Sequence, residues 1–395
     1  MLRKSLALLL CLFILSGCAP VPEEPTQTAS PSTVPETTAV TETTAPPETT
    51  VATEPVFDSF ALSQSMSTEE MVGQLFLARH PGNEAQALAD LQTYHLGGYI
   101  LFARDFQFQT PDTMRGITAV LQSSSPVPLL IAVDEEGGSV NRISCHSQYR
   151  ESPFPSPRRL YESGGLSSLL STEAEKCELL SSLGVNVNMA PVCDISTDPA
   201  AFMYSRSLGL SQYRTAQVVS AMVKTMSENG IGSVLKHFPG YGNNTDTHTG
   251  IAVDSRPLEA LEAEDLFPFR YCIQAGCQAI LVSHTIVEAL DPTAPASLSA
   301  PVIRYLREKM GFEGVVVTDD LVMQAITSTY GTGEAAVLAV EAGCDLLCSS
   351  QYPEQYQAVL DAVNSGRVSQ ERLSEAVARV LTWKYALGLL DAPQI

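Results

Sequence analysis

The chain has 395 residues, of which 45% are hydrophobic, and its 23 Lys and Arg against 44 Asp and Glu give a formal net charge of −21. This length and apolar content can support a sizeable core in one large domain or two ordinary ones. The acidic excess argues against nucleic acid or an anionic membrane surface as a partner, because no basic patch would supply the counter-charge.

The N-terminus has the charged, apolar and small-residue zones of a secretory signal. Arg3 and Lys4 precede an apolar run from Leu6 to Leu15, which is too short to span a bilayer comfortably. Ser16 and Gly17 then lead to Cys18, an ending that resembles a bacterial lipoprotein signal, in which Cys18 would become the lipidated first residue. We therefore expect an exported protein, anchored by lipid to the outer face of the cell membrane; an ordinary signal cleaved elsewhere is the alternative.

Residues 19–56 are rich in Pro, Thr, Glu and Ala and almost free of aromatic residues. Such a composition cannot bury enough apolar surface to offset the entropy of ordering. We expect a disordered tether here, followed by one folded domain over residues 57–395.

From residue 57 onward, short apolar runs bounded by turn residues alternate with longer helical patterns, such as Thr172 to Leu183, Gln212 to Asn229 and Pro301 to Lys309. The candidate strands are Gln74 to Ala78, Gly98 to Phe102, Leu129 to Val133, Val185 to Ala190, Ser233 to His237, Ala279 to Ser283, Val315 to Thr318, and Asp345 to Cys348. Eight such repeats predict an α/β fold, a parallel (β/α)8 barrel of the TIM type, with a doubly wound open sheet as the alternative. A closing helix is expected from about Ser369, its N-cap, to Leu387.

Two of the nine cysteines lie in the N-terminal signal, Cys11 and Cys18. The other seven are scattered through apolar segments, so we predict mostly free, buried thiols. No pair has CxxC spacing with a histidine nearby, and no metal site is expected.

Polar and ionisable residues stand where the predicted strands end. Asp134 follows the third strand, Lys236 and His237 end the fifth, His284 follows the sixth and Asp319 the seventh. A barrel brings these strand ends to one face, which is where barrel enzymes have their active sites.

Four motifs in this order resemble glycoside hydrolase family 3, specifically its single-domain β-N-acetylglucosaminidases. They are Asp134-Glu135-Glu136-Gly137-Gly138-Ser139-Val140-Asn141-Arg142, Arg206-Ser207-Leu208-Gly209, Lys236 to His248, and Thr318-Asp319-Asp320-Leu321. The resemblance covers the chain from about Phe57 and implies a glycosidase without metal or organic cofactor. Its expected substrate is a β-GlcNAc-containing glycan or muropeptide, and a monomer is expected.

The resemblance implies that Asp319 is the nucleophile of a retaining glycosidase and that a loop histidine, His248, is the acid and base, with Asp246 beside it. This is chemically sensible, because Asp246 could fix the tautomer of His248 and favour its cationic form. The imidazolium would protonate the departing oxygen, and the neutral ring would later activate water.

Further matches imply substrate contacts. Asp134 would accept hydrogen bonds from sugar hydroxyls, and Arg142, Arg206, Lys236 and His237 would supply donors around the ring and its acetamido group. A structural salt bridge at the barrel mouth is the alternative for each. Asp320 and Glu135 are expected to be structural carboxylates, and His284 receives no role.

The chain departs from the usual family pattern in one loop. Tyr241 and Asn243 stand where His and Asp are common, and the stretch from Gly242 to Asp246 is one residue shorter. The dyad spacing of Asp246 and His248 is kept.

The leading hypothesis is an exo-β-N-acetylglucosaminidase that removes terminal β-linked GlcNAc from peptidoglycan fragments or related glycans through a covalent glycosyl-enzyme intermediate. A phosphorylase with the same intermediate and a β-glucosidase or β-xylosidase are alternatives among enzymes. A sugar-binding lipoprotein with an inactive barrel is the alternative from another class.

Overall fold

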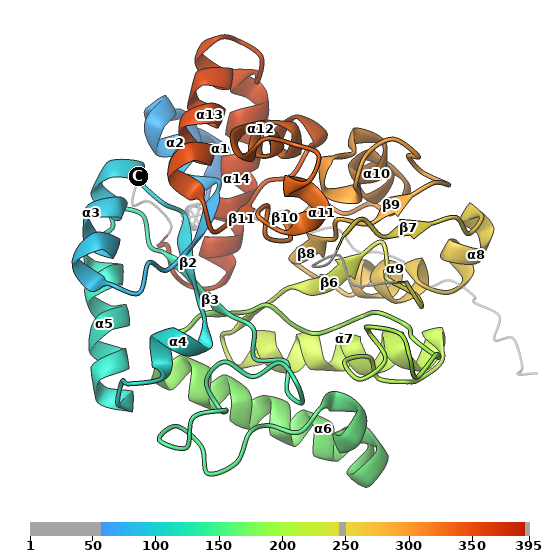
Figure 1. The fold of residues 1–395 in the computed structure, drawn as a ribbon. Helices are drawn as coiled ribbons and strands as arrows, with labels where there is room; N and C mark the ends of the chain where they lie inside the picture. The colour runs from blue at the N-terminus through green and yellow to red at the C-terminus, as the bar shows by residue number, and fades with distance from the viewer. Residues whose placement is uncertain (1–56, 245–249, 392–395) are drawn as a thin grey trace, which may run out of the picture. The chain divides into compact units, whose positions relative to one another are not determined.

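The computed structural model describes residues 57–244 and 250–391, and within them parallel strands alternate with helices around a ring (Figure 1). The strands of the ring are β1 (Phe76–Arg79), β2 (Gly98–Leu101), β3 (Leu130–Val133), β4 (Val187–Asn188), the consecutive pieces β5 (Gly232–Ser233) and β6 (Leu235–Phe238), β8 (Ala279–Val282), β10 (Val315–Thr318) and β11 (Leu347–Ser349).

Two connections close this ring. Six strands pair in the order β11-β1-β2-β3-β4-β5, and three pair in the order β10-β8-β6. Only Val234 separates β5 from β6, and a parallel bridge between Val317 and Leu346 joins β10 to the start of the last strand. The sheet therefore closes on itself. The predicted (β/α)8 barrel is confirmed, and the open-sheet alternative is wrong.

Helices precede, connect and follow the strands. They are α1 (Ser59–Gln64), α2 (Thr68–Gln74), α3 (Glu84–Tyr94), α4 (Ala103–Phe106), α5 (Pro111–Ser123), α6 (Pro157–Ser182), α7 (Gln212–Glu228), α8 (Leu258–Ala263), α9 (Leu266–Gln274), α10 (Ala300–Arg304), α11 (Gln324–Thr327), α12 (Thr332–Ala342), α13 (Tyr352–Asn364) and α14 (Gln370–Ala386), with a 3₁₀ turn at Ala296–Leu298 and a π turn at Tyr305–Lys309. The short strands β7 (Val253–Asp254) and β9 (Ile286–Val287) pair with each other outside the ring.

Several predicted elements differ in their bounds, among them the fourth strand, which was expected over Val185 to Ala190 and spans only Val187–Asn188. The helix expected from Thr172 begins at Pro157, where the Ser156 side chain caps it, and it bends at Gly165, whose φ is 65°. The helix expected over Pro301 to Lys309 is an α-helix that ends in the π turn. The fifth strand is interrupted at Val234, while the Ser369 N-cap of α14 lies where it was predicted.

The inside of the barrel is filled with side chains rather than open. Alternate strand residues point inward and pack together, and Trp383 and Val380 of α14 belong to the same cluster. The inward strand residues include Leu77, Ile100, Leu130, Val187, Leu281, Val315 and Val317. The closing helix therefore packs against the end of the barrel at which the strands begin.

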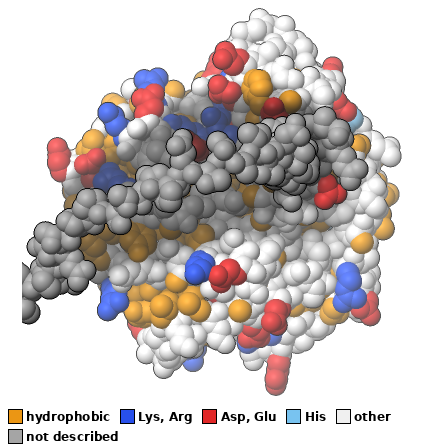
Figure 2. Space-filling view, turned by 180° about the vertical axis from the view of Figure 1, so that it is seen from behind, with side chains coloured by type: hydrophobic (Ala, Val, Ile, Leu, Met, Phe, Trp, Pro, Cys, Tyr) orange, Lys and Arg blue, Asp and Glu red, His pale blue; other side chains and the backbone are white. Residues whose placement is uncertain are grey.

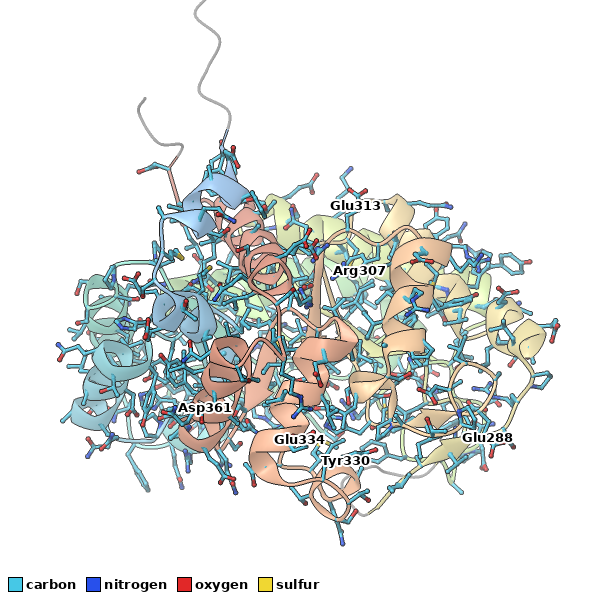
Figure 3. All side chains as sticks on the ribbon, turned by 90° about the horizontal axis from the view of Figure 1, so that it is seen from above. Glu288, Arg307, Glu313, Tyr330, Glu334 and Asp361 are labelled. Atoms are coloured by element: carbon cyan, nitrogen blue, oxygen red, sulfur yellow. The ribbon has the colours of Figure 1, made fainter. Side chains whose placement is uncertain are left out.

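The two ends of the barrel can be followed in Figure 3. Arg307 and Glu313, which precede β10, mark the end where the strands begin. Glu288 and Tyr330 lie in connections that leave the strands at the carboxyl end. On the face shown in Figure 2, acidic and basic side chains are scattered in small groups.

The seven cysteines from Cys145 onward are all free thiols. Six of them are buried, as predicted, and Cys145 is exposed. Among the described helices none is both long and apolar enough to cross a bilayer. The predicted signal, Cys18 and the tether at 19–56 lie outside the described residues.

Candidate active site

A cavity of about 820 Å³ opens at the carboxyl ends of the barrel strands. Its lining includes all five substrate-contact residues expected from the sequence and the expected nucleophile: Asp134, Arg142, Arg206, Lys236, His237 and Asp319. Of the residues that the sequence placed at separate strand ends, Asp134, Lys236, His237 and Asp319 are thus brought together, whereas His284 is buried and is not part of this lining. Asp246 and His248 lie outside the described residues.

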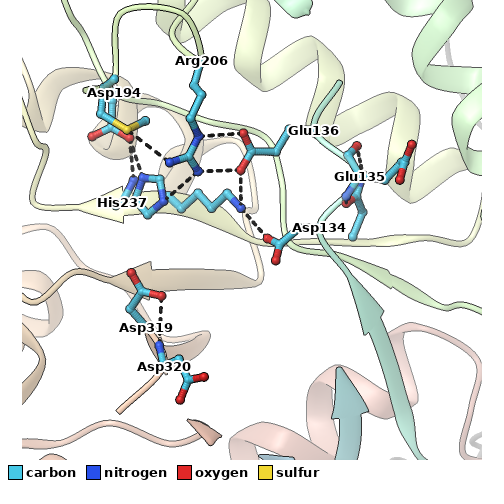
Figure 4. A network of polar contacts seen from close by, with 11 residues as sticks. Asp134, Glu135, Glu136, Asp194, Arg206, His237, Asp319 and Asp320 are labelled. Carbon is cyan, nitrogen blue, oxygen red and sulfur yellow. Dashed lines mark hydrogen bonds and ion pairs between the residues drawn. The ribbon is translucent and has the colours of Figure 1, made fainter. Parts of the chain in front are cut away.

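A buried carboxylate, Glu136, is the centre of a charged network on one wall (Figure 4). Arg206 binds it in a bidentate manner, with Nε 3.0 Å from Oε2 and Nη2 2.6 Å from Oε1. Lys236 Nζ lies 2.7 Å from Glu136 Oε1 and also donates to Asp134 Oδ1 at 2.7 Å. Both cations were predicted from their motifs as substrate contacts, whereas the carboxylate that holds them was not, although Glu136 stands in the motif from Asp134 to Arg142.

The charges in this network support one another. Burial opposes ionisation of Glu136, but Lys236 and Arg206 outweigh it and hold its pKa well below the usual range. Burial likewise lowers the pKa of Lys236, yet Asp134 and Glu136 raise it above the ordinary value. The cavity wall therefore carries fixed charges throughout the neutral pH range.

His237 is held between Arg206 and a second carboxylate that the sequence analysis missed, Asp194. Asp194 Oδ2 lies 2.8 Å from His237 Nδ1 and also accepts the His237 backbone N–H, while Oδ1 accepts the N–H of Tyr241. Arg206 Nη2 lies 3.3 Å from His237 Nε2 and can only donate, so Nε2 accepts and the ring proton sits on Nδ1. In this arrangement the ring N–H of His237 donates to Asp194, and the role of His237 toward a substrate stays a prediction.

Asp319 follows β10 and faces the Glu136 network from the other side of the cavity (Figure 4). Its Oδ1 accepts the backbone N–H of Asp320 at 2.9 Å. Asp320 itself is tied back, since its carboxylate accepts the backbone N–H groups of Val322 and Ser350 and the Ser350 hydroxyl. Burial raises the pKa of Asp320, and its contacts are those of a structural carboxylate.

Glu135 is also structural. Its carboxylate is buried and accepts the backbone N–H groups of Arg142, Ile143 and Ser144, at 2.7, 2.8 and 3.2 Å. It thereby shapes the loop that carries Arg142 into the cavity. His284 is buried behind Asp320, with Nδ1 2.7 Å from Ser297 Oγ and Nε2 3.0 Å from the Asp320 carbonyl oxygen.

The two departures from the family pattern have visible contacts. The Tyr241 ring lines the cavity and meets the edge of His237, with ring centroids 5.2 Å apart. Asn243 Oδ1 accepts hydrogen bonds from the Ser196 hydroxyl and from the N–H groups of Thr197 and Asp198, at 3.2 to 3.3 Å. Asn243 therefore joins the loop after β6 to the segment after β4.

No group of three or more potential metal ligands occurs within residues 57–244 and 250–391. Two of the cavity cations, Arg206 and Lys236, are instead paired with carboxylates, an arrangement that can bind neutral polar groups by hydrogen bonds. A closed parallel barrel with such a cavity at the carboxyl ends of its strands has the architecture of a barrel enzyme.

Comparison with known proteins identifies the family. Residues 67–383 match the glycosyl hydrolase family 3 N-terminal domain, and the chain belongs to this family. A β-hexosaminidase of Xylella fastidiosa (strain 9a5c) is 35% identical over 309 residues, which cover 76% of this chain and 89% of that protein. A β-hexosaminidase of Nitrosomonas eutropha is 31% identical over 299 residues, covering 71% and 83%.

Solved structures agree with this assignment. A family 3 β-N-acetylglucosaminidase from Paenibacillus sp. superposes with a TM-score of 0.78 at 33% identity, covering 84% of this chain and 64% of that longer one. LpqI of M. tuberculosis superposes with a TM-score of 0.76 at 28% identity, covering 83% and 96%.

Proposed function

We propose that this protein is a retaining exo-β-N-acetylglucosaminidase that hydrolyses terminal β-linked GlcNAc. The observation that carries the proposal is the likeness to β-hexosaminidases over 89% of their length, combined with Asp319 facing the Lys236, Glu136 and Arg206 cluster in one cavity. Retaining hydrolysis needs a carboxylate nucleophile and a separate acid, and Asp319 supplies the first.

In the first step, the ionised Asp319 carboxylate attacks the anomeric carbon of the terminal sugar. The bond from that carbon to the leaving oxygen breaks, and the His248 imidazolium gives its proton to the departing oxygen. Asp246 would stabilise the cationic ring before this transfer. The product is a covalent ester between Asp319 and the sugar.

In the second step, the neutral His248 ring takes a proton from water as the water oxygen attacks the same carbon. The ester bond breaks, and Asp319 leaves as a carboxylate. Two inversions at one carbon give net retention.

The Glu136 network would orient the sugar during both steps. Lys236 and Arg206 are fixed by short ion pairs before substrate arrives, so little reorganisation is needed when their remaining N–H groups meet sugar oxygens. The Asp134 side chain is 19% exposed, so its carboxylate can still accept a hydrogen bond from a sugar hydroxyl in the cavity.

The N-terminal sequence suggests where this activity operates. A lipid on Cys18 and a tether over residues 19–56 would hold the barrel outside the cell membrane, where glycan fragments of peptidoglycan occur. Metabolic labelling with a fatty acid should label the wild-type chain and not Cys18→Ser.

To test the proposal, the release of nitrophenol from nitrophenyl β-N-acetylglucosaminide is measured for the wild type and for Asp319→Asn. Each protein is assayed in buffers with and without phosphate. The expected result is wild-type activity that is indifferent to phosphate and falls at least about 10⁴-fold in the variant. Phosphate-dependent formation of GlcNAc-1-phosphate would show a phosphorylase instead. Faster cleavage of the β-glucoside would show a β-glucosidase, and absence of turnover with retained glycan binding would show a binding protein.

A further inference from the structure

Two arginines of the cavity, Arg79 and Arg142, form no ion pair with a carboxylate of residues 57–244 and 250–391. Arg79 ends β1, and Arg142 lies in the loop after β3. The Nε atoms of both side chains are buried, and neither has a hydrogen-bond partner within the described part of the chain. The two guanidinium groups thus differ from the guanidinium group of Arg206 and the ammonium group of Lys236, which form ion pairs with Glu136 and Asp134.

Both guanidinium groups lie at the same aromatic ring. The Phe102 ring centroid is 4.7 Å from Arg79 Cζ and 5.8 Å from Arg142 Cζ. Both side chains are partly exposed to the cavity, and a cation–π contact contributes only about 0.5–2 kcal/mol, so an oxyanion would be a stronger partner for either guanidinium group. We call Arg79, Phe102 and Arg142 the arginine corner.

The arginine corner is more positive than a neutral sugar requires. GlcNAc offers hydroxyls and an amide, and Asp134, Lys236 and Arg206 already supply acceptors and donors for these. Two further cations in the cavity of a chain with a net charge of −21 point to a ligand that carries negative charge. A planar guanidinium binds a carboxylate or a similar oxyanion through two parallel hydrogen bonds.

The corner lies on the side of the cavity that carries Asp134, which the proposed function assigns to a hydroxyl of the terminal sugar. Asp134 directly follows β3, and Arg142 lies in the same loop after β3. Arg79 ends β1, which β2 joins to β3 in the sheet. An anionic group on the terminal sugar would therefore lie within the part of the cavity that these residues line.

We propose that the arginine corner binds an anionic substituent on the terminal sugar itself, so that the enzyme prefers an acidic terminal amino sugar to neutral GlcNAc. This inference rests on the proposed function and adds the substrate class. A carboxylate in an ether substituent at C3, as in muramic acid, and a sulfate ester at C6 are two sources of the same oxyanion chemistry.

The experiment compares three nitrophenyl β-glycosides: the neutral N-acetylglucosaminide, its 6-O-sulfate and the N-acetylmuraminide. The wild type should show a kcat/KM at least about tenfold higher for one acidic glycoside than for the neutral one, and the preferred glycoside identifies the source of the anion. Arg79→Gln should lower the ratio of acidic to neutral kcat/KM at least about tenfold. Arg79→Lys should retain part of the preference, because it keeps the charge and loses the planar fork.

Arg214→Gln is the matched control. Arg214 is exposed on α7, where its Nη1 donates to Gln217, so the substitution removes the same charge outside the cavity. It should leave the ratio unchanged. A wild type that prefers the neutral glycoside to both acidic ones, or an Arg79→Gln variant that loses all three activities by the same factor, would overturn the proposal. Failure of the wild type to cleave any of the three would overturn the proposed function and this inference with it.

Discussion

Two lysines are buried to nearly the same degree at opposite ends of the barrel, and they differ in what surrounds them. Lys236 is 2% exposed at the carboxyl end, where Asp134 and Glu136 raise its pKa. Lys384 of α14 is fully buried, and its Nζ donates to an amide oxygen, Gln74 Oε1, at 2.7 Å. Burial there lowers the pKa of Lys384 to about 7.

The difference shows what each end of the barrel is built to do. At the cavity, carboxylates keep the buried lysine charged, so that it can hold polar substrate groups. At the closed end, one neutral partner cannot offset the loss of hydration, and a charge in that position costs stability. Burial alone therefore does not predict a functional lysine; the charges of its neighbours do.

Lys236→Met gives the largest expected effect and tests the first half of this comparison. It removes a charged donor from the cavity and leaves Asp134 without its cation. We expect kcat/KM for the aryl N-acetylglucosaminide to fall roughly 10³-fold, with a loss of about 3 kcal/mol in the free energy of unfolding. Steady-state kinetics and urea unfolding measure the two losses. Near-wild-type activity would mean that the Glu136 network is structural only.

Glu136→Gln tests what the Glu136 carboxylate contributes while both of its cationic partners, Lys236 and Arg206, are kept. The amide keeps the shape of the side chain and removes the charge that Lys236 and Arg206 share. We expect a fall in kcat/KM of roughly 10- to 100-fold, with a loss of about 1–3 kcal/mol in stability. If the substitution changes neither kcat/KM nor stability, the Glu136 carboxylate does not position Lys236 and Arg206.

Lys384→Met tests the second half of the comparison and should change stability in the opposite direction. The unfolded lysine has a pKa of 10.5 and the folded one about 7, so the unfolded chain binds more protons between these values. The free energy of unfolding of the wild type therefore rises with pH across this window. The variant should be more stable by roughly 2–4 kcal/mol at pH 7, and its advantage should shrink as pH approaches 10.

Urea unfolding of both proteins at pH 7, 8.5 and 9.5 measures this trend, and aryl-glycoside turnover serves as the control, because Lys384 lies at the far end from the cavity. An advantage that does not depend on pH would show that packing, rather than the charge of Lys384, sets the difference.

Most of the barrel could be predicted from the sequence because each parallel strand is buried on both faces and reads as a short apolar run. The predicted runs at Gly98, Leu129 and Val315 match β2, β3 and β10 within about one residue at each end. The early part of α6 was missed, since Gly164 and Gly165 interrupt its helical pattern, although Ser156 and Pro157 marked its start.

Site residues that stand in a sequence motif could be predicted. Site residues whose role depends on a partner far away in the chain could not. Asp319, Lys236 and Arg206 stand in motifs, and all three line the cavity. The role of Glu136 depends on cations 70 and 100 residues later in the chain, and that of Asp194 on a histidine 43 residues later. A single sequence shows neither pairing, and the same holds for Arg79, whose isolation is visible only in the fold.

As the proposed nucleophile, Asp319 must form a covalent bond to the sugar, and the decisive experiment is to trap that intermediate. A 5-fluoro β-GlcNAc derivative with a good leaving group should slow the second step and accumulate the glycosyl-enzyme. Mass spectrometry of the wild type should then show an increase of one fluorosugar per chain, located on the peptide that contains Asp319 and absent in Asp319→Asn. An adduct on another residue, or turnover without an adduct and with inversion at the anomeric carbon, would contradict the account.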